Sequence, residues 1–300
     1  MDDADWKMLL GRIKDGKCTP FLGAGVNFGI LPLGAEVARA LAKDFRYPMD
    51  DSSDLARVAQ YLAVVNDPMF PKEEILKMLG KQVQEWEKRV PQEKFFSSRE
   101  EILSVLAALP FPIYVTTNYD DLLVRALRIC RKDPKRELCR WNKYVREEPS
   151  VFDSPAGFEP STANPVVFHL HGHDRVPESL VLSEDDYLDF LVNAARQQDL
   201  IPPRIKRALT GSSLLFVGYR LADWDFRVVF KGLVESLEGS LRRMNVSVQL
   251  PPQCEREDSR LEQQSYLARY FGNMKVQVYW GTAQEFAREL KERWEAYEHG

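Results

Sequence analysis

The sequence has no uninterrupted apolar run approaching the roughly 20 residues that a membrane-spanning helix requires. Its first ten residues, MDDADWKMLL, are acidic and therefore lack the basic start of a secretory signal peptide. The sequence also contains no cluster of basic residues. Its 41 Lys and Arg residues against 45 Asp and Glu residues leave a formal net charge of −4. This charge disfavours direct binding to nucleic-acid phosphates. We therefore expect a cytoplasmic protein that binds neither membranes nor nucleic acid.

Cysteine is scarce and irregularly spaced. Cys18, Cys130, Cys139 and Cys254 contain no C-x-x-C pair and do not match a structural zinc site, so we expect reduced thiols and no structural metal. Internal repeats and low-complexity segments are absent as well. With 300 residues, of which 44% are hydrophobic and 29% charged, the chain has the composition of an ordinary globular protein. We expect a single domain over residues 1–300.

Short apolar strands alternate with amphipathic helices along the chain. This alternation predicts an α/β protein of Rossmann-like, doubly wound architecture with a mainly parallel sheet. Strands are expected at 19–22, 113–117, 166–170, 213–217, 246–250 and 275–280. Helices are expected at 3–14, 35–42, 121–127, 184–197, 203–209, 224–237, 260–271 and 283–297, and the proline-rich segment 134–165 is expected to be irregular.

Residues from 50 to 109 show helical patterns throughout. The pair Ser53-Asp54 can cap one helix, Pro71 can start a second, and Ser98 with Glu101 fits a capping box for a third. We therefore expect a helical insertion at about 50–109.

Unusual residues follow four of the expected strands. In doubly wound sheets, ligands bind outside the carboxyl ends of the strands, where the strand order reverses. The four segments are GAGVN at 23–27, TTNYDD at 116–121, HLHGH at 169–173 and VGYRLADWDFR at 217–227. These segments are the candidates for a ligand site.

The glycine-containing segments have two open interpretations each. The GAGVN backbone could approach a pyrophosphate, because glycine has no Cβ and a helix N-terminus is favourable to anions, or it could be a simple tight turn. Gly218 could permit close approach to a nucleotide ribose. Asp223 and Asp225, which follow it, could belong to a site or could cap the next helix.

Asn118 and the histidines also leave alternatives. The Asn118 amide could hold a ribose hydroxyl or an attacking water without competing for a proton, or it could cap the following helix. His169, His171 and His173 are three of the four histidines in the chain. A turn at Gly172 means that their spacing does not force a metal cluster. A single imidazole, with an ordinary pKa near ~6.5, could be a general base or a structural side chain.

Taken together and in this order, GAGVN, TTNYDDLL, HLHGH and LLFVGYRLADWDF resemble the SIR2-like domain of many bacterial antiphage proteins, which is distantly similar to the sirtuins. The resemblance runs from about Lys17 to Trp280. It implies that NAD is bound as a substrate and that no metal is needed. The four-cysteine zinc module of sirtuins is absent, which favours hydrolysis of NAD to nicotinamide and ADP-ribose over deacylation.

The resemblance also implies a role for each candidate residue. Asn118 would orient the nicotinamide ribose and the nucleophilic water, Asp120 would contact the carboxamide, and His171 would act as a base toward a ribose hydroxyl. The remaining cofactor-binding candidates are Gly23, Ala24, Gly25, Val26 and Asn27 at the pyrophosphate, Thr117 beside Asn118, Gly218 and Tyr219 at the adenosine ribose, and Trp280, Gly281 and Thr282 at the adenine. Asn27 departs from the serine that relatives often carry, which leaves the phosphate contact open at that position.

Uncontrolled NAD hydrolysis would kill the host cell, and no sensor domain is recognisable in the sequence. We therefore expect an NAD-depleting antiphage effector that is regulated by homo-oligomerisation or by a separately encoded protein subunit. Two alternatives remain. The chain could be an NAD-dependent protein deacylase, or it could be a regulatory module that binds NAD or ADP-ribose without turnover, in which Asn118 and His171 are only ligand contacts.

Overall fold

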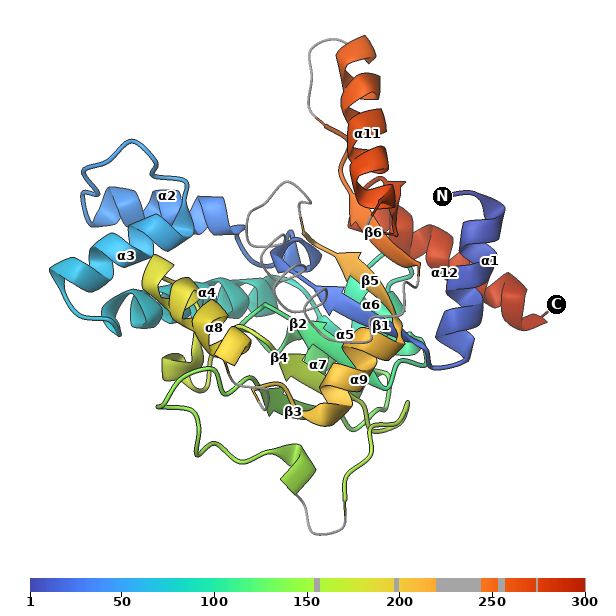
Figure 1. Ribbon diagram of the computed structural model, residues 1–300, viewed down its shortest axis with the longest axis horizontal. Helices are drawn as coiled ribbons and strands as arrows, with labels where there is room; N and C mark the ends of the chain where they lie inside the picture. The colour runs from blue at the N-terminus through green and yellow to red at the C-terminus, as the bar shows by residue number, and fades with distance from the viewer. Residues whose placement is uncertain (154–156, 197–199, 220–243, 253–256, 274, 300) are drawn as a thin grey trace.

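A computed structural model describes residues 1–153, 157–196, 200–219, 244–252, 257–273 and 275–299. Within these residues, a 7-stranded sheet has the order β3-β4-β2-β1-β5-β6-β7, and every neighbouring pair is parallel (Figure 1). The strands are β1 Cys18–Leu22, β2 Ile113–Thr116, β3 Lys135–Leu138, β4 Val166–His169, β5 Ser213–Val217, β6 Asn245–Gln249 and β7 Val276–Trp280. The predicted Rossmann-like α/β fold is confirmed. The helix expected at 224–237, together with Asp223, Asp225 and Cys254, lies outside the described residues.

Strand β3 corrects the prediction that residues 134–165 are irregular. Three of its four residues, Lys135, Arg136 and Glu137, are charged, so the segment lacks the apolar pattern of the other strands. Two of its charges are paired, because Arg136 binds Asp121 after β2, 15 positions earlier, and the buried Glu137 binds the nearby Arg140. The ion pair with Asp121, which lies beyond the strand itself, helps to stabilise this charged edge strand.

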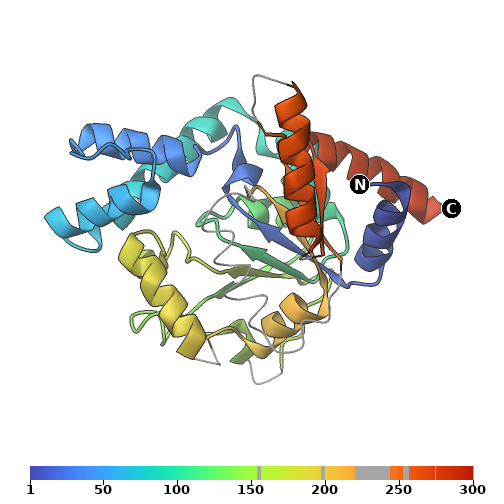
Figure 2. The same ribbon diagram turned by 45° about the horizontal axis from the view of Figure 1, so that its top comes forward.

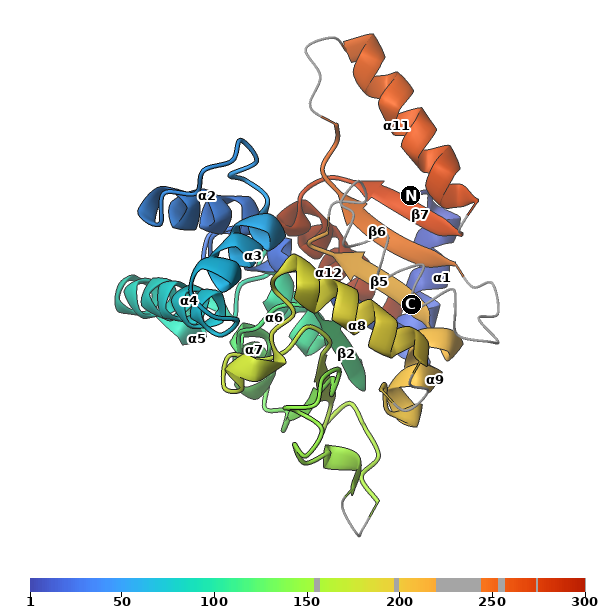
Figure 3. The ribbon, with the colours of Figure 1, turned by 60° about the vertical axis from the view of Figure 1, so that its left-hand side comes forward.

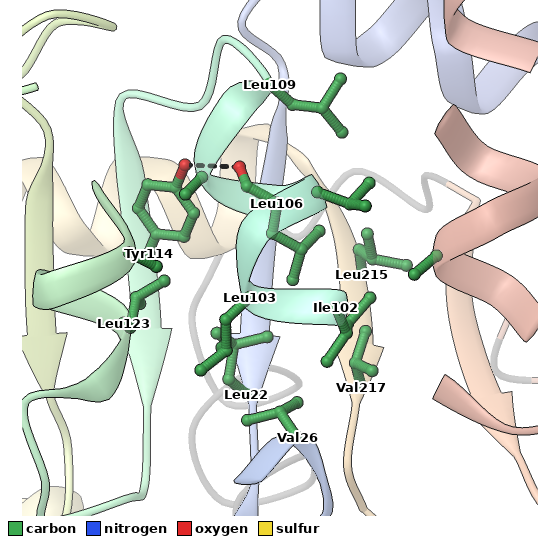
Figure 4. Packing of buried hydrophobic residues seen from close by; sticks show 14 of the residues in the cluster. Leu22, Val26, Ile102, Leu103, Leu106, Leu109, Tyr114, Leu123, Leu215 and Val217 are labelled. Carbon is green, nitrogen blue, oxygen red and sulfur yellow. Dashed lines mark hydrogen bonds between the residues drawn. The ribbon is translucent and has the colours of Figure 1, made fainter. Parts of the chain in front are cut away.

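One face of the sheet is covered by α1 (Asp3–Lys14), α6 (Ile102–Ala108), α7 (Leu122–Ile129) and α12 (Ala283–His299). Figure 4 shows Leu103 of α6 packed near Leu22 of β1, with Val26 just beyond the strand end. The Tyr114 hydroxyl of β2 donates a hydrogen bond to the Leu106 carbonyl at 2.9 Å. This packing anchors the carboxyl end of β1 and the loop that follows it.

The opposite face is covered by α8 (Glu184–Arg196), α9 (Pro203–Gly211) and α11 (Glu257–Gly272). Its core is rich in aromatic side chains, including Phe21 of β1, Phe168 of β4 and Phe216 of β5. Figures 2 and 3 show α11 running beside the β6–β7 edge and projecting past it. Because both faces are covered, the central strands are buried along their whole length, as parallel strands require.

The segment 50–109 contains α3 (Leu55–Val65), α4 (Phe70–Arg89), the short α5 (Gln92–Phe95) and α6. Asp54 caps α3 by accepting the Arg57 N–H, as predicted, and Pro71 lies in the first turn of α4. The predicted capping box at Ser98 is wrong. The cap of α6 is Glu101, whose carboxylate accepts the Ser104 N–H at 2.7 Å.

Helices α3 and α4 form a separate small core with α2 (Gly34–Asp44) and Leu182. They stand beside the sheet near the carboxyl ends of its strands (Figure 3). Three short 3-10 turns complete the described elements: η1 Ala24–Asn27, η2 Val151–Asp153 and η3 Pro177–Ser179. Over the part of the chain that the structure describes, every helix is too short or too polar to span a bilayer.

Candidate functional site

The four strands that precede the candidate segments are consecutive in the sheet, in the order β4-β2-β1-β5. The chain passes from β1 to β2 on one side and later returns to β5 on the other side, so the strand order reverses between β1 and β5. Ligands bind at such reversals in doubly wound sheets. The glycine loop after β1 and Gly218 after β5 lie at this point, and Asn118 and the histidine segment follow the next two strands.

The glycines first serve to bring the ends of β1 and β5 together. Gly218 has a φ of 84°. A methyl group there would lie 2.6 Å from the Gly23 carbonyl oxygen and from the Val26 nitrogen. The Gly25 N–H donates to the Gly218 oxygen at 3.0 Å, and the Gly23 N–H donates to Val217 at 2.9 Å. These two N–H groups are engaged within the protein, so contacts from this loop to a pyrophosphate would have to come from its other polar groups.

Asn118 links the loop after β2 to the glycine loop. Its side-chain amide donates to the Gly23 carbonyl at 3.1 Å, across 95 positions of the chain. Its own N–H donates to the Thr116 hydroxyl at 3.0 Å. The alternative of a helix cap is wrong for Asn118, because α7 begins at Leu122, whose N–H is accepted by Asp120.

Asp120 is partly buried between the glycine loop and α7. Its carboxylate accepts the Asn27 side-chain amide at 2.6 Å and the Leu122 N–H at 2.9 Å. Burial raises the pKa of Asp120 from 3.8 to about 6, because the charged form loses its hydration. The Asn27 amide is therefore committed to Asp120. The carboxylate also lines a pocket of about 280 Å³, whose opposite wall is formed by Leu79 and Val83 of α4.

Thr117 and Tyr219 join the ends of β2 and β5. The Tyr219 hydroxyl donates to the Leu22 carbonyl at 3.1 Å and lies 2.8 Å from the Thr117 hydroxyl. Since the single phenolic hydrogen is directed at Leu22, Thr117 is the donor to Tyr219. The Tyr219 carbonyl in turn accepts the Gln249 amide at 2.8 Å. These two candidates are thus brought together at the reversal point.

His171 is enclosed by α8. Its ring packs edge-on against Tyr187 and Phe190, with ring centroids 5.5 and 5.3 Å away. The residue is 3% exposed, and its Nε2 atom is buried with no hydrogen-bond partner. Desolvation by burial lowers the pKa of His171 from 6.5 to about 3, so the imidazole is neutral at physiological pH. Gly172, with a φ of 97°, makes the turn after it, where a Cβ would lie 2.4 Å from the Ser179 oxygen.

Asp121, His169 and His173 place one potential ligand atom each within 4.8 Å of one another. Asp121 Oδ1 already accepts Arg136 Nε at 2.6 Å and His173 Nε2 at 3.0 Å. Its Oδ2 accepts Arg136 Nη2 at 2.7 Å and Arg175 Nη2 at 2.9 Å. A carboxylate has about four lone-pair positions, so none is left for a cation, and two guanidinium groups would repel one. This set of donors does not fit a metal ion.

The Asp121 cluster was not singled out by the sequence, although Asp121 lies within TTNYDD. Burial opposes ionisation of Asp121, but the hydrogen bonds from His173 and Arg136 outweigh it and hold the pKa of this carboxyl well below its usual range. Asp121 is therefore a charged anchor for the loops after β2 and β4. Arg136 carried no signal, because it lies in the segment predicted to be irregular.

Trp280, Gly281 and Thr282 lie at the end of β7, which is separated from β1 by β5 and β6. Thr282 forms a reciprocal cap with Glu285: the Thr282 N–H donates to the carboxylate at 2.7 Å, and the Glu285 N–H donates to the Thr282 hydroxyl at 3.1 Å. Gly281 donates to the Gln249 carbonyl at 2.8 Å. The structure thus gives these residues a capping and sheet-end role, apart from the cluster around Asn118.

The fold and the gathered strand ends define a doubly wound α/β protein with its candidate site at the reversal of strand order. A family model described as the SIR2-like domain matches residues 112–271. This chain belongs to the SIR2-like domain family.

Similar proteins carry the name NAD(+) hydrolase ThsA. The one from Acinetobacter baumannii (strain 532279) is 24% identical over 231 residues, covering 74% of this chain and 41% of that protein. The one from Bacillus cereus (strain MSX-D12) is 22% identical over 224 residues, with the same 74% and 41% coverage. The one from Enterococcus faecium is 26% identical over 119 residues, covering 40% of this chain and 22% of that protein. The chain therefore spans about two fifths of the length of the first two relatives.

Proposed function

We propose that this chain hydrolyses NAD by breaking the bond between nicotinamide and ribose, with nicotinamide and ADP-ribose as products. The observation that carries the proposal is the 3.1 Å hydrogen bond from the Asn118 amide to the Gly23 carbonyl. It joins the residue assigned to the inner ribose to the loop assigned to the pyrophosphate. The similar proteins named NAD(+) hydrolase support NAD as the substrate and hydrolysis as the type of reaction.

The reaction needs a site that stabilises a developing positive charge on the ribose. The C1′–nitrogen bond breaks with its electron pair passing to the nicotinamide ring nitrogen, which becomes neutral, and a water oxygen forms the new bond to C1′. Asn118 orients the ribose and this water. The carboxylate of Asp120, which lines a pocket with both apolar and charged residues, would contact the carboxamide and favour the cationic transition state.

The proton of the attacking water needs an acceptor. His171 is neutral and has an unpartnered Nε2, so it can accept a hydrogen bond from a ribose hydroxyl or from the water. Asp120, with a pKa raised to about 6, is mostly ionised at pH 7.5 and is better matched to proton transfer near neutral pH. We assign the orienting role to Asn118, the hydrogen-bond-accepting role to His171 and the proton-accepting role to Asp120.

Nicotinamide release from NAD tests this proposal. We expect release, by the chain alone or in an assembled state, that needs no acylated peptide and is lost in Asn118→Ala and His171→Ala, with circular dichroism spectra as evidence that both variants fold. Release that requires an acylated peptide would instead identify a deacylase. NAD binding without release, alone and with candidate partners, would identify a non-catalytic binding module.

We further propose that the chain belongs to an NAD-depleting antiphage effector that is inactive until a partner or self-assembly activates it. The enclosure of His171 by α8 supports this proposal, because NAD cannot reach the imidazole while Tyr187 and Phe190 cover it. The start of α8 is tied to the α3–α4 core through Lys72–Asp186 at 2.9 Å and Gln60–Asp185 at 2.7 Å. An assembly contact on α3 or α4 would be transmitted to α8 through these links. Nicotinamide release that is independent of protein concentration and of any partner would contradict it.

A further inference from the structure

We infer that His169 is a positioning residue for Asn118, holding the main chain of Asn118 so that its amide stays on the glycine loop. His169 is the last residue of β4 and is paired in register with Thr116 of β2. Its Nδ1 lies 3.2 Å from the Asn118 carbonyl oxygen. A carbonyl oxygen only accepts, so Nδ1 carries the proton and donates it.

Asn118 is consequently held at three points. Its N–H donates to the Thr116 hydroxyl at 3.0 Å, its carbonyl accepts from His169, and its side-chain amide donates to the Gly23 carbonyl at 3.1 Å. The first two bonds come from adjacent strands and fix both peptide planes around the residue. Because those planes set the direction of the side chain, the amide is aimed before any ligand arrives, which lowers the entropy lost in reaching a reactive arrangement.

The burial of His169 and its lowered pKa suit a fixed hydrogen-bond donor and do not suit a base. It is 1% exposed, and its Nε2 is buried without a hydrogen-bond partner. Desolvation lowers the pKa of His169 to about 3, so the imidazole stays neutral and keeps the same donor at all physiological pH values. The ring of His173 packs edge-on against it, with centroids 4.5 Å apart, and His173 is fixed by Asp121 at 3.0 Å. The His169 ring, and with it the Nδ1 donor, is therefore held in place by His173.

The test compares three variants. His169→Leu removes the donor, whereas His169→Asn places an amide nitrogen near the former Nδ1 position. Val167→Ala is the matched control, because Val167 lies two residues earlier on the same strand, is fully buried and packs in the apolar core of the same face without a hydrogen-bonding side chain. Crystal structures of all three show where the Asn118 amide lies. We expect it to leave the Gly23 carbonyl in His169→Leu only, and an unmoved amide in that variant would overturn the inference.

The kinetic part of the test rests on the proposed NAD hydrolysis. Losing one hydrogen bond that orients the reactive arrangement should lower kcat roughly three- to tenfold with little change in KM. His169→Asn should recover most of that loss, and Val167→Ala should lower only the melting temperature. If the wild-type chain releases no nicotinamide in any state, the proposed function fails and the crystal structures still decide the inference. If it is active and His169→Leu keeps its kcat, positioning is refuted while hydrolysis stands.

Discussion

The side-chain amide of Asn27 donates a 2.6 Å hydrogen bond to the carboxylate of Asp120, 93 positions further along the chain. This bond ties the glycine loop after β1 to the start of α7. It also means that a partly buried carboxylate with a raised pKa lies between the loop proposed for the pyrophosphate and the pocket beside α4. The consequences for pH dependence can be measured.

Asp120→Asn should lower nicotinamide release while increasing stability. The pKa of Asp120 is raised from 3.8 to about 6 in the folded chain, so ionisation opposes folding. The stability that the protonated form contributes is complete below the unfolded value and is lost as the pH rises through 6. The variant should therefore gain at most about 3 kcal/mol of unfolding free energy at pH 8 and nothing at pH 3. The hydrogen bond to Asn27 is kept, because the Asn27 side chain can turn to present its amide oxygen to the new amide. Urea unfolding at both pH values measures this, and a variant less stable at pH 8 would contradict it.

Gly218→Ala should disrupt the contact between the ends of β1 and β5, where the strand order reverses. Gly29→Ala is its control. Both glycines have similar backbone angles, with φ of 84° and 88°. The Cβ at Gly29 would meet open space, whereas the Cβ at Gly218 would meet two backbone atoms at 2.6 Å. We expect the Gly29 variant to lose roughly 1–2 kcal/mol from backbone strain alone, and the Gly218 variant to lose more and to lose nucleotide binding. Equal losses in urea unfolding would show that the contact with the glycine loop is unimportant.

Phe190→Ala should expose the His171 imidazole. In the folded chain burial depresses the pKa of His171 to about 3, so its contribution to stability is present above pH 6.5 and is lost as the pH falls toward 3. Removing the ring should return the pKa toward 6.5 and cost about 3–5 kcal/mol. NMR titration of His171 measures the shift, with Phe190→Leu as the control that keeps an apolar cover. A pKa that stays low in the alanine variant would mean that α8 is not what desolvates the ring.

Lys72→Ala should destabilise the link between the α3–α4 core and α8. The Lys72 and Asp186 side chains are 7% and 15% exposed, and Lys72 also lies over the Trp141 ring. Removing the ammonium leaves the partly buried Asp186 without a cationic partner, with the Leu182 and Ser183 N–H groups left to stabilise its charge, and should cost up to about 3 kcal/mol. Lys77→Ala is the control, because Lys77 lies on the same helix, its side chain is 77% exposed, and such surface pairs contribute at most about 1 kcal/mol. Thermal unfolding of the two variants should separate them, and similar losses would count against a buried link.

Much of the fold could be predicted from local patterns, and the exceptions have physical reasons. The helix at 3–14 was predicted to the residue, because its apolar spacing and acidic start are local features. Strand β3 was missed, because three of its four residues are charged and lack the apolar pattern of a strand, and because the Asp121 partner of Arg136 lies outside the segment. The capping role proposed for Asn118 was also wrong, since Asp120 accepts the first N–H of α7 instead.

The candidate site divides in the same way. The four segments that collect at the sheet edge were recognisable from residue types alone, because strand ends and glycines have local requirements. Their partners were not recognisable: the amide of Asn27 on Asp120, the imidazole of His169 on Asn118 and the aromatic cover over His171.

The amino-acid sequence by itself determined the parallel α/β class and the residues that follow each strand, because apolar periodicity and turn chemistry act over a few positions. Only the tertiary structure decided which of those residues touch, which imidazole reaches Asn118 and which is shut away beneath α8. The reason is that strand order brings together residues about 50 to 200 positions apart, and burial then sets the pKa of each group by what surrounds it.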